Sequence, residues 1–115
     1  MSTKPVFIAL KIVDALEIRD TTEHYSDIVG FEPEKYNSLT IVVENSLDQD
    51  ITVQVQGALN YDFTIGVCNI GSSKTISANS NDYISVDDYF PFIRVKIIAS
   101  TTPSAGNVNV YIVKR

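Results

Sequence analysis

The sequence is poor in the residues from which most catalytic and metal sites are built. Among 115 residues it has one cysteine, one histidine, one methionine and no tryptophan. Because Cys68 is alone, no disulfide can form within the chain, which excludes a disulfide-stapled secreted scaffold. No Cys and His residues have zinc-ligand spacing, and the five scattered glycines form no phosphate-binding loop. We therefore expect no cofactor and no enzymatic activity.

Long apolar runs and an excess of basic charge are also missing. No stretch approaches the roughly 20 apolar residues that a membrane helix needs, so we expect no membrane partner. The run from Val6 to Leu10 is closed by Lys11 and Asp14 too early for a signal peptide, which predicts a protein made in the cytoplasm and not secreted by that route. With 14 acidic against 9 basic residues, the net charge is −5. Such a surface repels phosphate backbones and makes nucleic acid an unsuitable partner.

What the sequence does contain is typical of β-structure. Valine and isoleucine together number 27, whereas leucine occurs 5 times and alanine 6 times. β-Branched side chains have few χ1 rotamers and pack well on a pleated sheet. Serine, threonine and asparagine are abundant and suit turns and polar strand faces. A chain of this length is one domain that can bury a core without a metal.

Alternating apolar and polar residues predict about eight strands at a spacing of roughly ten residues, with no helix. The expected strands cover residues 5–13, 24–29, 38–44, 51–56, 63–67, 75–78, 93–99 and 108–114, and residues 16–19 and 83–86 are expected to form a short extension and a brief pairing. This pattern favours an all-β fold, a single-domain antiparallel β-sandwich of the jelly-roll or Ig-like type. We expect residues 1–13 to form an N-terminal arm or first strand, and residues 14–115 to form the sandwich domain.

Two strand assignments have consequences for pairing. Residues 38–44 and 51–56 flank a short polar link, which predicts an antiparallel hairpin with Thr52, Gln54 and Gln56 on a solvated face. The strand at 5–13 is largely apolar on both faces, so we expect a neighbouring subunit to cover one of them. The predicted interface residues are Val6, Phe7, Ile8, Ala9 and Leu10.

Carboxylates form one candidate cation site. Asp82, Asp87 and Asp88, with Asn79 and Asn81, lie within ten residues and offer the oxygen ligands that Ca²⁺ prefers. Their spacing does not match the 12-residue Ca²⁺ loop. Aspartate and asparagine also favour turns, and that interpretation is the stronger one here.

Three other features are weaker candidates. His24 lies in a polar stretch without a nucleophile motif, which is typical of a surface histidine. Cys68 lies at the end of an expected strand, in the segment 65–69, where a lone cysteine is usually a small buried hydrophobe. Tyrosine is favoured at interfaces, and six tyrosines could line a binding surface: Tyr25, Tyr36, Tyr61, Tyr83, Tyr89 and Tyr111.

Four segments also carry a resemblance. They are residues 36–45 (YNSLTIVVEN), 51–57 (ITVQVQG), 88–95 (DYFPFIRV) and 108–115 (VNVYIVKR). This succession resembles small β-sandwich proteins encoded among the virion structural genes of bacteriophages and related prokaryotic viruses. It covers roughly the last 80 residues, and the first 35 have no counterpart. The resemblance implies a decoration, head-completion or tail component without enzymatic activity.

We therefore expect a non-enzymatic structural protein that self-assembles or decorates a larger particle, a viral capsid or tail component. Its partners would be itself and other virion proteins, and its location the virion or the cytoplasm of the producing cell. The alternative is a lectin-like module that binds carbohydrate or another ligand, with Ca²⁺ at Asp82, Asp87 and Asp88. An assembly protein would form oligomers, whereas a ligand-binding module would be a monomer or simple dimer that binds glycans.

Overall fold

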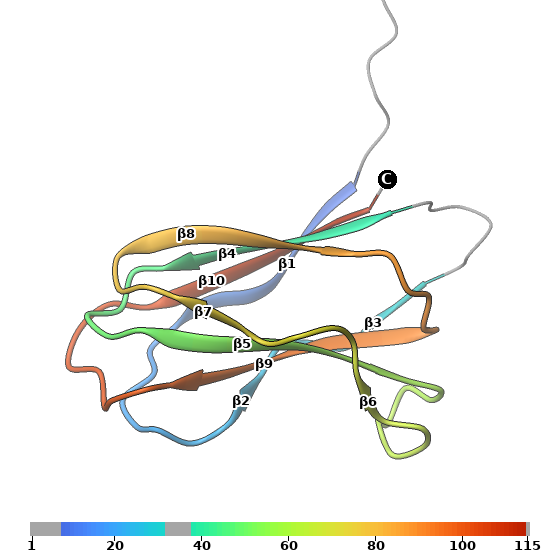
Figure 1. Cartoon of the computed structure of the whole chain (residues 1–115), viewed down its shortest axis with the longest axis horizontal. Helices are drawn as coiled ribbons and strands as arrows, with labels where there is room; N and C mark the ends of the chain where they lie inside the picture. The colour runs from blue at the N-terminus through green and yellow to red at the C-terminus, as the bar shows by residue number, and fades with distance from the viewer. Residues whose placement is uncertain (1–7, 32–37, 115) are drawn as a thin grey trace, which may run out of the picture.

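The protein is a sandwich of two antiparallel β-sheets, which confirms the predicted all-β fold class (Figure 1). The computed structural model describes residues 8–31 and 38–114, and within these ranges it contains no helix and therefore no helix able to cross a membrane. The strands are β1 (Ile8–Leu16), β2 (His24–Tyr25), β3 (Val29–Gly30), β4 (Leu39–Asn45), β5 (Ile51–Ala58), β6 (Cys68–Asn69), β7 (Lys74–Ile76), β8 (Ser80–Val86), β9 (Phe92–Ala99) and β10 (Val108–Lys114).

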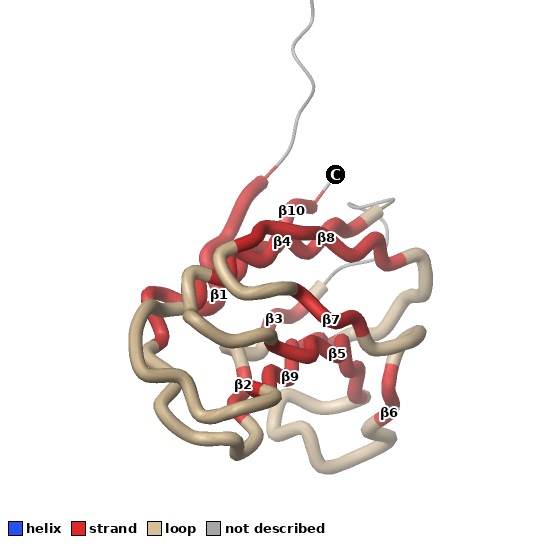
Figure 2. The backbone as a smooth tube through the Cα atoms, turned by 60° about the vertical axis from the view of Figure 1, so that its left-hand side comes forward, coloured by secondary structure: helices blue, strands red, loops and turns tan. Residues whose placement is uncertain are grey.

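The two sheets differ in size and regularity. The four-stranded sheet has the order β1-β10-β4-β8. The six-stranded sheet has the order β2-β9-β5-β6, with β3 also pairing β9 and β7 also pairing β5. Figure 2 shows the two layers of strands with loops joining their ends. Sequential strands repeatedly change sheets, so neighbours in space are mostly distant in sequence.

Isoleucine and valine fill the space between the sheets. Strand β9 shows the alternation most clearly, because Ile93, Val95, Ile97 and Ala99 are buried while the residues between them are half-buried. Strand β5 adds further valines and isoleucines from the same sheet as β9, and Ile41 of β4 with the valines and isoleucines of β10 faces them from the four-stranded sheet. Fully burying one such side chain stabilises the fold by roughly 1.5–3 kcal/mol. The β-branched composition thus serves both the pleated backbone and the core.

The predicted hairpin between residues 38–44 and 51–56 is wrong. Strand β4 pairs with β10 and β8, whereas β5 pairs with β9, β7 and β6 in the other sheet. The link between them crosses the sandwich and buries Leu47 completely. Alternation shows only that one face of a strand is buried. The same alternation occurs in the two strands of a hairpin and in two strands that face each other across a core.

The predicted solvated face of β5 is also wrong. Gln54 and Gln56 point away from the core but are only 7% and 8% exposed. The Gln54 amide donates to the carbonyl oxygen of Ile70 at 3.3 Å, and the Gln56 amide donates to Asn69 Oδ1 at 3.0 Å. Residues at and just after β6, which lies beside β5 in the sheet, therefore accept hydrogen bonds from both glutamines.

Strand β1 belongs to the four-stranded sheet and pairs with β10, from Ile8 opposite Lys114 to Leu16 opposite Val108. Its side chains do not alternate regularly between the two faces, because the register shifts after Lys11 and again after Val13. Such irregularities place Ile12 and Val13, which are adjacent, both in the core. The first residues of the expected strand at 5–13 lie outside the described part of the chain.

Candidate interaction surfaces

The most apolar exposed segment is the connection between β5 and β6, residues 59–67, which we call the apolar loop. Four of its side chains are exposed: Leu59 (59%), Tyr61 (64%), Ile65 (58%) and Val67 (42%). They are half of the eight large hydrophobic residues that are exposed in the described part of the chain. Apolar side chains gathered in this way often mark a surface that contacts another molecule.

Asn60 holds the apolar loop in one conformation. Its amide nitrogen donates to Thr64 Oγ1 at 2.8 Å, and its Oδ1 accepts the backbone N–H groups of Thr64 and Ile65, both at 3.0 Å. The Leu59 N–H donates to the Ile65 carbonyl at 2.9 Å and closes the loop. Gly66 has φ +64°, a backbone conformation that is unfavourable for residues with a Cβ atom. The exposed side chains are therefore presented on a fixed backbone.

Phe63 anchors the apolar loop to the six-stranded sheet. Its φ is +56° and its side chain is 6% exposed. The Arg94 guanidinium carbon lies 4.2 Å from the centroid of the Phe63 ring and 4.1 Å from that of Tyr25, and Arg94 Nε donates to Gln56 Oε1 at 3.0 Å. The predicted strand at 63–67 is wrong, because the backbone turns at Phe63 and again at Gly66.

The second surface is the start of β1, which includes part of the predicted interface. Ala9 and Leu10 are exposed there, Leu10 by 38%. Val6, Phe7 and the side chain of Ile8 lie outside the described part, so their role stays a prediction.

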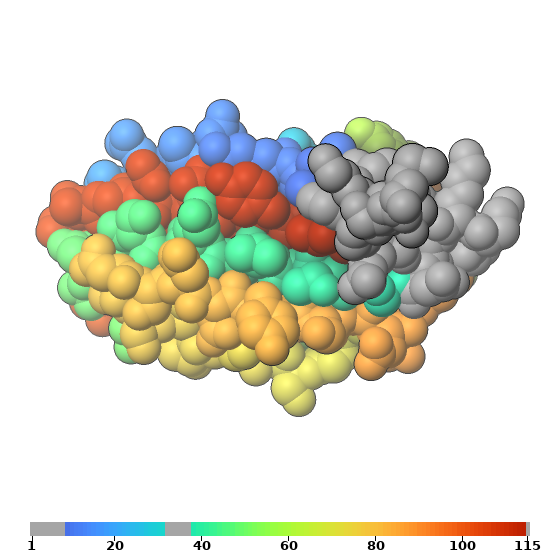
Figure 3. Space-filling model, turned by 90° about the horizontal axis from the view of Figure 1, so that it is seen from above, coloured from blue at the N-terminus to red at the C-terminus, as the bar shows by residue number. Residues whose placement is uncertain are grey.

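Tyrosines lie on both sheets and do not form one rim. Figure 3 views the outer face of the four-stranded sheet, where β1, β10, β4 and β8 lie side by side. On this sheet, Lys11 Nζ lies 5.6 Å from the ring centroid of Tyr111, and the ring centroid of Tyr83 lies 5.6 Å from Nζ of Lys74, which belongs to β7 of the other sheet. Tyr61 lies in the apolar loop, with its ring 5.9 Å from that of Phe92. Among the remaining tyrosines, Tyr25 contacts Arg94, the Tyr89 hydroxyl donates to the Phe31 carbonyl, and Tyr36 lies outside the described residues.

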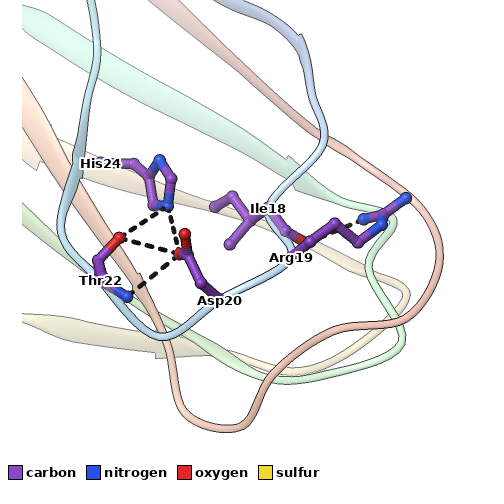
Figure 4. Close-up of polar contacts among 5 residues, drawn as sticks. All are labelled: Ile18, Arg19, Asp20, Thr22 and His24. Atoms are coloured by element: carbon purple, nitrogen blue, oxygen red, sulfur yellow. Dashed lines mark hydrogen bonds and ion pairs between the residues drawn. The ribbon is translucent and has the colours of Figure 1, made fainter.

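His24, the first residue of β2, forms a small polar cluster with residues of the preceding loop (Figure 4). His24 Nε2 lies 2.8 Å from Asp20 Oδ1, and the Thr22 hydroxyl donates to the same oxygen at 2.9 Å. The hydrogen bond with His24, followed by those from Thr22, lowers the pKa of Asp20. A nucleophile activated by histidine would need its hydroxyl to donate to the imidazole. Here the hydroxyl donates to the carboxylate, which is the geometry of a stabilised turn.

The structure does not assemble the candidate cation site. Asp82 Oδ1 accepts from Lys74 Nζ at 3.0 Å, while Asp87 and Asp88 are exposed in the connection after β8. Within residues 8–31 and 38–114, no group of three or more His, Cys, Asp or Glu side chains could hold a metal ion. Cys68, expected to be buried, is exposed on the short strand β6.

The lowered pKa values of three aspartates predict how the stability of the fold changes with pH. Hydrogen bonds from His24, Ser104 and Lys74 lower the pKa values of Asp20, Asp48 and Asp82, respectively, below 3.8. A carboxyl whose pKa is lower in the folded state stabilises the fold above its unfolded pKa, and that stabilisation is lost as the pH falls through the folded pKa. We expect the melting temperature to fall on acidification below about pH 4.

The variant Asp48→Asn tests this assignment. It removes the carboxylate that accepts the Ser104 N–H at 3.0 Å, so its melting temperature should be lower at pH 7 and depend less on pH between about 4 and 2. Thermal unfolding followed by circular dichroism measures both values. Asp62→Asn, at an exposed position of the apolar loop, is the matched control. An acid dependence as steep in Asp48→Asn as in the wild type would contradict the assignment.

The described fold is one that occurs in proteins of phage and viral origin. No protein-family model matches the sequence, and no curated protein matches it. Among solved structures, the PBSX exported protein XepA has a TM-score of 0.70 at 10% identity over 93% of this chain. The SPBc2 prophage-derived protein YomS has a TM-score of 0.54 at 13% identity, covering 99% of this chain and 96% of its own. The infectious bursal disease virus VP2 subviral particle has a TM-score of 0.56 at 11% identity over 98% of this chain.

These similarities show the fold alone, because the identities are low. The chain spans 36% of the XepA chain and 33% of the VP2 chain, so it corresponds to part of each of those proteins. With YomS, by contrast, the match extends over nearly all of both chains. The expected resemblance to small β-rich virion proteins is confirmed at the level of the fold.

Proposed function

We propose that the protein is a non-enzymatic structural component of a virus particle, a capsid or tail protein that self-assembles. The apolar loop is the observation that carries this proposal. Four exposed apolar side chains would favour burial against another protein surface. Since Asn60 and Phe63 already fix the loop, docking would order little additional backbone. The fold shared with a prophage-derived protein and with a viral particle supports the same role.

The N-terminal residues are the second proposed contact. Val6, Phe7, Ile8, Ala9 and Leu10 would bind a neighbouring subunit. A deletion must stop before the core begins, because Ile12 and Val13 are 5% and 7% exposed and hold β1 in the sandwich. Removal of residues 1–7 would test this contact with the neighbouring subunit without removing β1.

The mass of the full chain in solution tests the proposal. We expect light scattering after size-exclusion chromatography to give a mass that is a multiple of 12.7 kDa and is maintained over a wide concentration range. The double variant Leu59→Asp/Ile65→Asp should form smaller species, because charge on the apolar loop opposes burial. Thr75→Asp/Thr101→Asp, at exposed polar positions, is the control and should keep the wild-type mass. A monomer at every concentration would contradict self-assembly, and an unchanged mass of the loop variant would exclude the loop as a contact.

A further inference from the structure

The two edge strands of the four-stranded sheet, β1 and β8, differ in whether their outward backbone groups have hydrogen-bond partners. At β8, side chains cap the backbone groups that point away from the sheet. Lys74 Nζ donates to the Tyr83 carbonyl at 3.1 Å, and Asp82 Oδ1 accepts the Tyr83 N–H at 2.8 Å. Lys74 and Asp82 are also bonded to each other at 3.0 Å. Both polar backbone groups of Tyr83 are thereby satisfied, which blocks the pairing of another strand at this edge.

Among the described residues, nothing of this kind protects the edge at β1 near its start. Within the described residues, β1 forms its ladder with β10 only, and its one backbone hydrogen bond to another segment joins the Ile12 carbonyl to the Asp27 N–H at 3.0 Å. Register shifts follow Lys11 and make the rest of the strand irregular. Residues 8–11 therefore form a regular strand whose outer edge pairs with no strand in the described part of the chain, and its Ala9 and Leu10 side chains are exposed.

We propose that residues 8–11 pair antiparallel with residues 8–11 of a second copy of this chain, joining two four-stranded sheets into one continuous sheet. The inference rests on the proposed self-assembly and specifies one of its contacts. Antiparallel strand pairing is self-complementary under two-fold symmetry, as a symmetric dimer requires. The open edge on one side and the capped edge on the other limit this mode of growth to two copies.

The charges of this segment fit a second copy. The chain carries a net charge of −5, yet residues 8–11 include no acidic side chain, so pairing brings no carboxylates together. The only charge is Lys11, whose ammonium is bonded to Asp14 at 2.8 Å. With the two-fold axis passing between the two copies of Leu10, each Lys11 lies opposite Ala9 of the other copy, and the two ammonium groups remain apart.

A charge placed on each edge tests the proposal. Leu10→Lys puts an ammonium on the open edge, and we expect it to lower the mass of the wild-type species at least twofold in light scattering. Ser85→Lys makes the corresponding change on the exposed side of β8 and should keep the wild-type mass. Circular dichroism confirms that both variants are folded. A wild-type mass for Leu10→Lys, or dissociation by Ser85→Lys alone, would overturn the pairing of β1 with β1.

Cross-linking gives a result that does not depend on the lysine variants. In a Cys68→Ser background, Leu10→Cys and Ser85→Cys each provide one exposed thiol. A short bismaleimide should link two copies through position 10 with several-fold higher yield than through position 85. Equal yields would overturn the inference while leaving self-assembly standing. A wild-type protein that is monomeric at every concentration would overturn the proposed function and the inference together.

Discussion

Replacing Gly106 with alanine is expected to lower the free energy of unfolding by about 4 kcal/mol or to prevent folding. Gly106 has φ +90°, a conformation that L-residues rarely adopt. A Cβ atom at this position would lie 1.9 Å from the Ser46 carbonyl oxygen and 2.8 Å from the Leu47 Cα. Both neighbours are backbone, so no side-chain rotation can relieve the overlap.

The close approach at Gly106 comes from the way the two sheets are connected. The link from β4 to β5 crosses the sandwich and packs against the loop before β10. The Ser46 N–H donates to the Asn107 carbonyl at 2.8 Å, and Asp48 Oδ1 accepts the Ser104 N–H at 3.0 Å. These hydrogen bonds draw the two backbones together on either side of Gly106. Alanine would have to separate them, breaking the bonds that hold the crossing.

Gly71→Ala separates the two causes of destabilisation. Gly71 has a similar φ of +69°, but a Cβ atom there would meet nothing within 4 Å. It should therefore lose only about 1–2 kcal/mol, the cost of a left-handed conformation. Urea unfolding followed by circular dichroism measures both variants. Equal losses would show that the backbone conformation, and not the contact with Ser46, governs the effect at Gly106.

Sequence alternation located the strongest strands but could not assign their partners. The strand expected at 93–99 is β9 with one additional residue, and the one expected at 108–114 is β10. Each alternates cleanly because it lies over the core. The partners of β4 and β5 were not recoverable, since the pattern does not record which sheet a strand occupies. The only sequence signal for the link that crosses the sandwich is Leu47, an apolar residue in a polar turn.

The apolar loop was missed for a related reason. Phe63, Ile65 and Val67 alternate like strand residues, yet the structure buries only the first of them. Their backbone is determined by Asn60, whose side chain bonds to residues four and five positions later, and by a glycine at positive φ. Asn60 and Gly66 were the available signals, because both residue types favour loops over strands. In the described part of the chain the carboxylates of the candidate cation site do not form a group that could hold a metal ion, because Asp82 lies on β8 whereas Asp87 and Asp88 follow it in the connection to β9.

Asn45→Asp is expected to reduce the free energy of unfolding by about 3–5 kcal/mol at pH 7, although the two side chains have nearly the same shape. Asn45 is 1% exposed, and its amide nitrogen lies 3.1–3.2 Å from three carbonyl oxygens, those of Gln49, Ile76 and Ser77. Its Oδ1 accepts the Leu47 N–H at 3.1 Å. A carboxylate keeps only this last hydrogen bond. It would face three acceptors with no proton to donate.

The pH dependence identifies the cause of that loss. Burial beside three carbonyl oxygens would raise the pKa of the new carboxyl above its unfolded value, so protonation restores a donor and the deficit relative to wild type shrinks as the pH falls from 7 towards 4. Urea unfolding at several pH values measures the deficit. Asn81→Asp, exposed on β8, is the matched control and should change stability by less than about 1 kcal/mol. A deficit at Asn45 that stays constant with pH would mean that the lost packing of the crossing link, and not the buried charge, destabilises the variant.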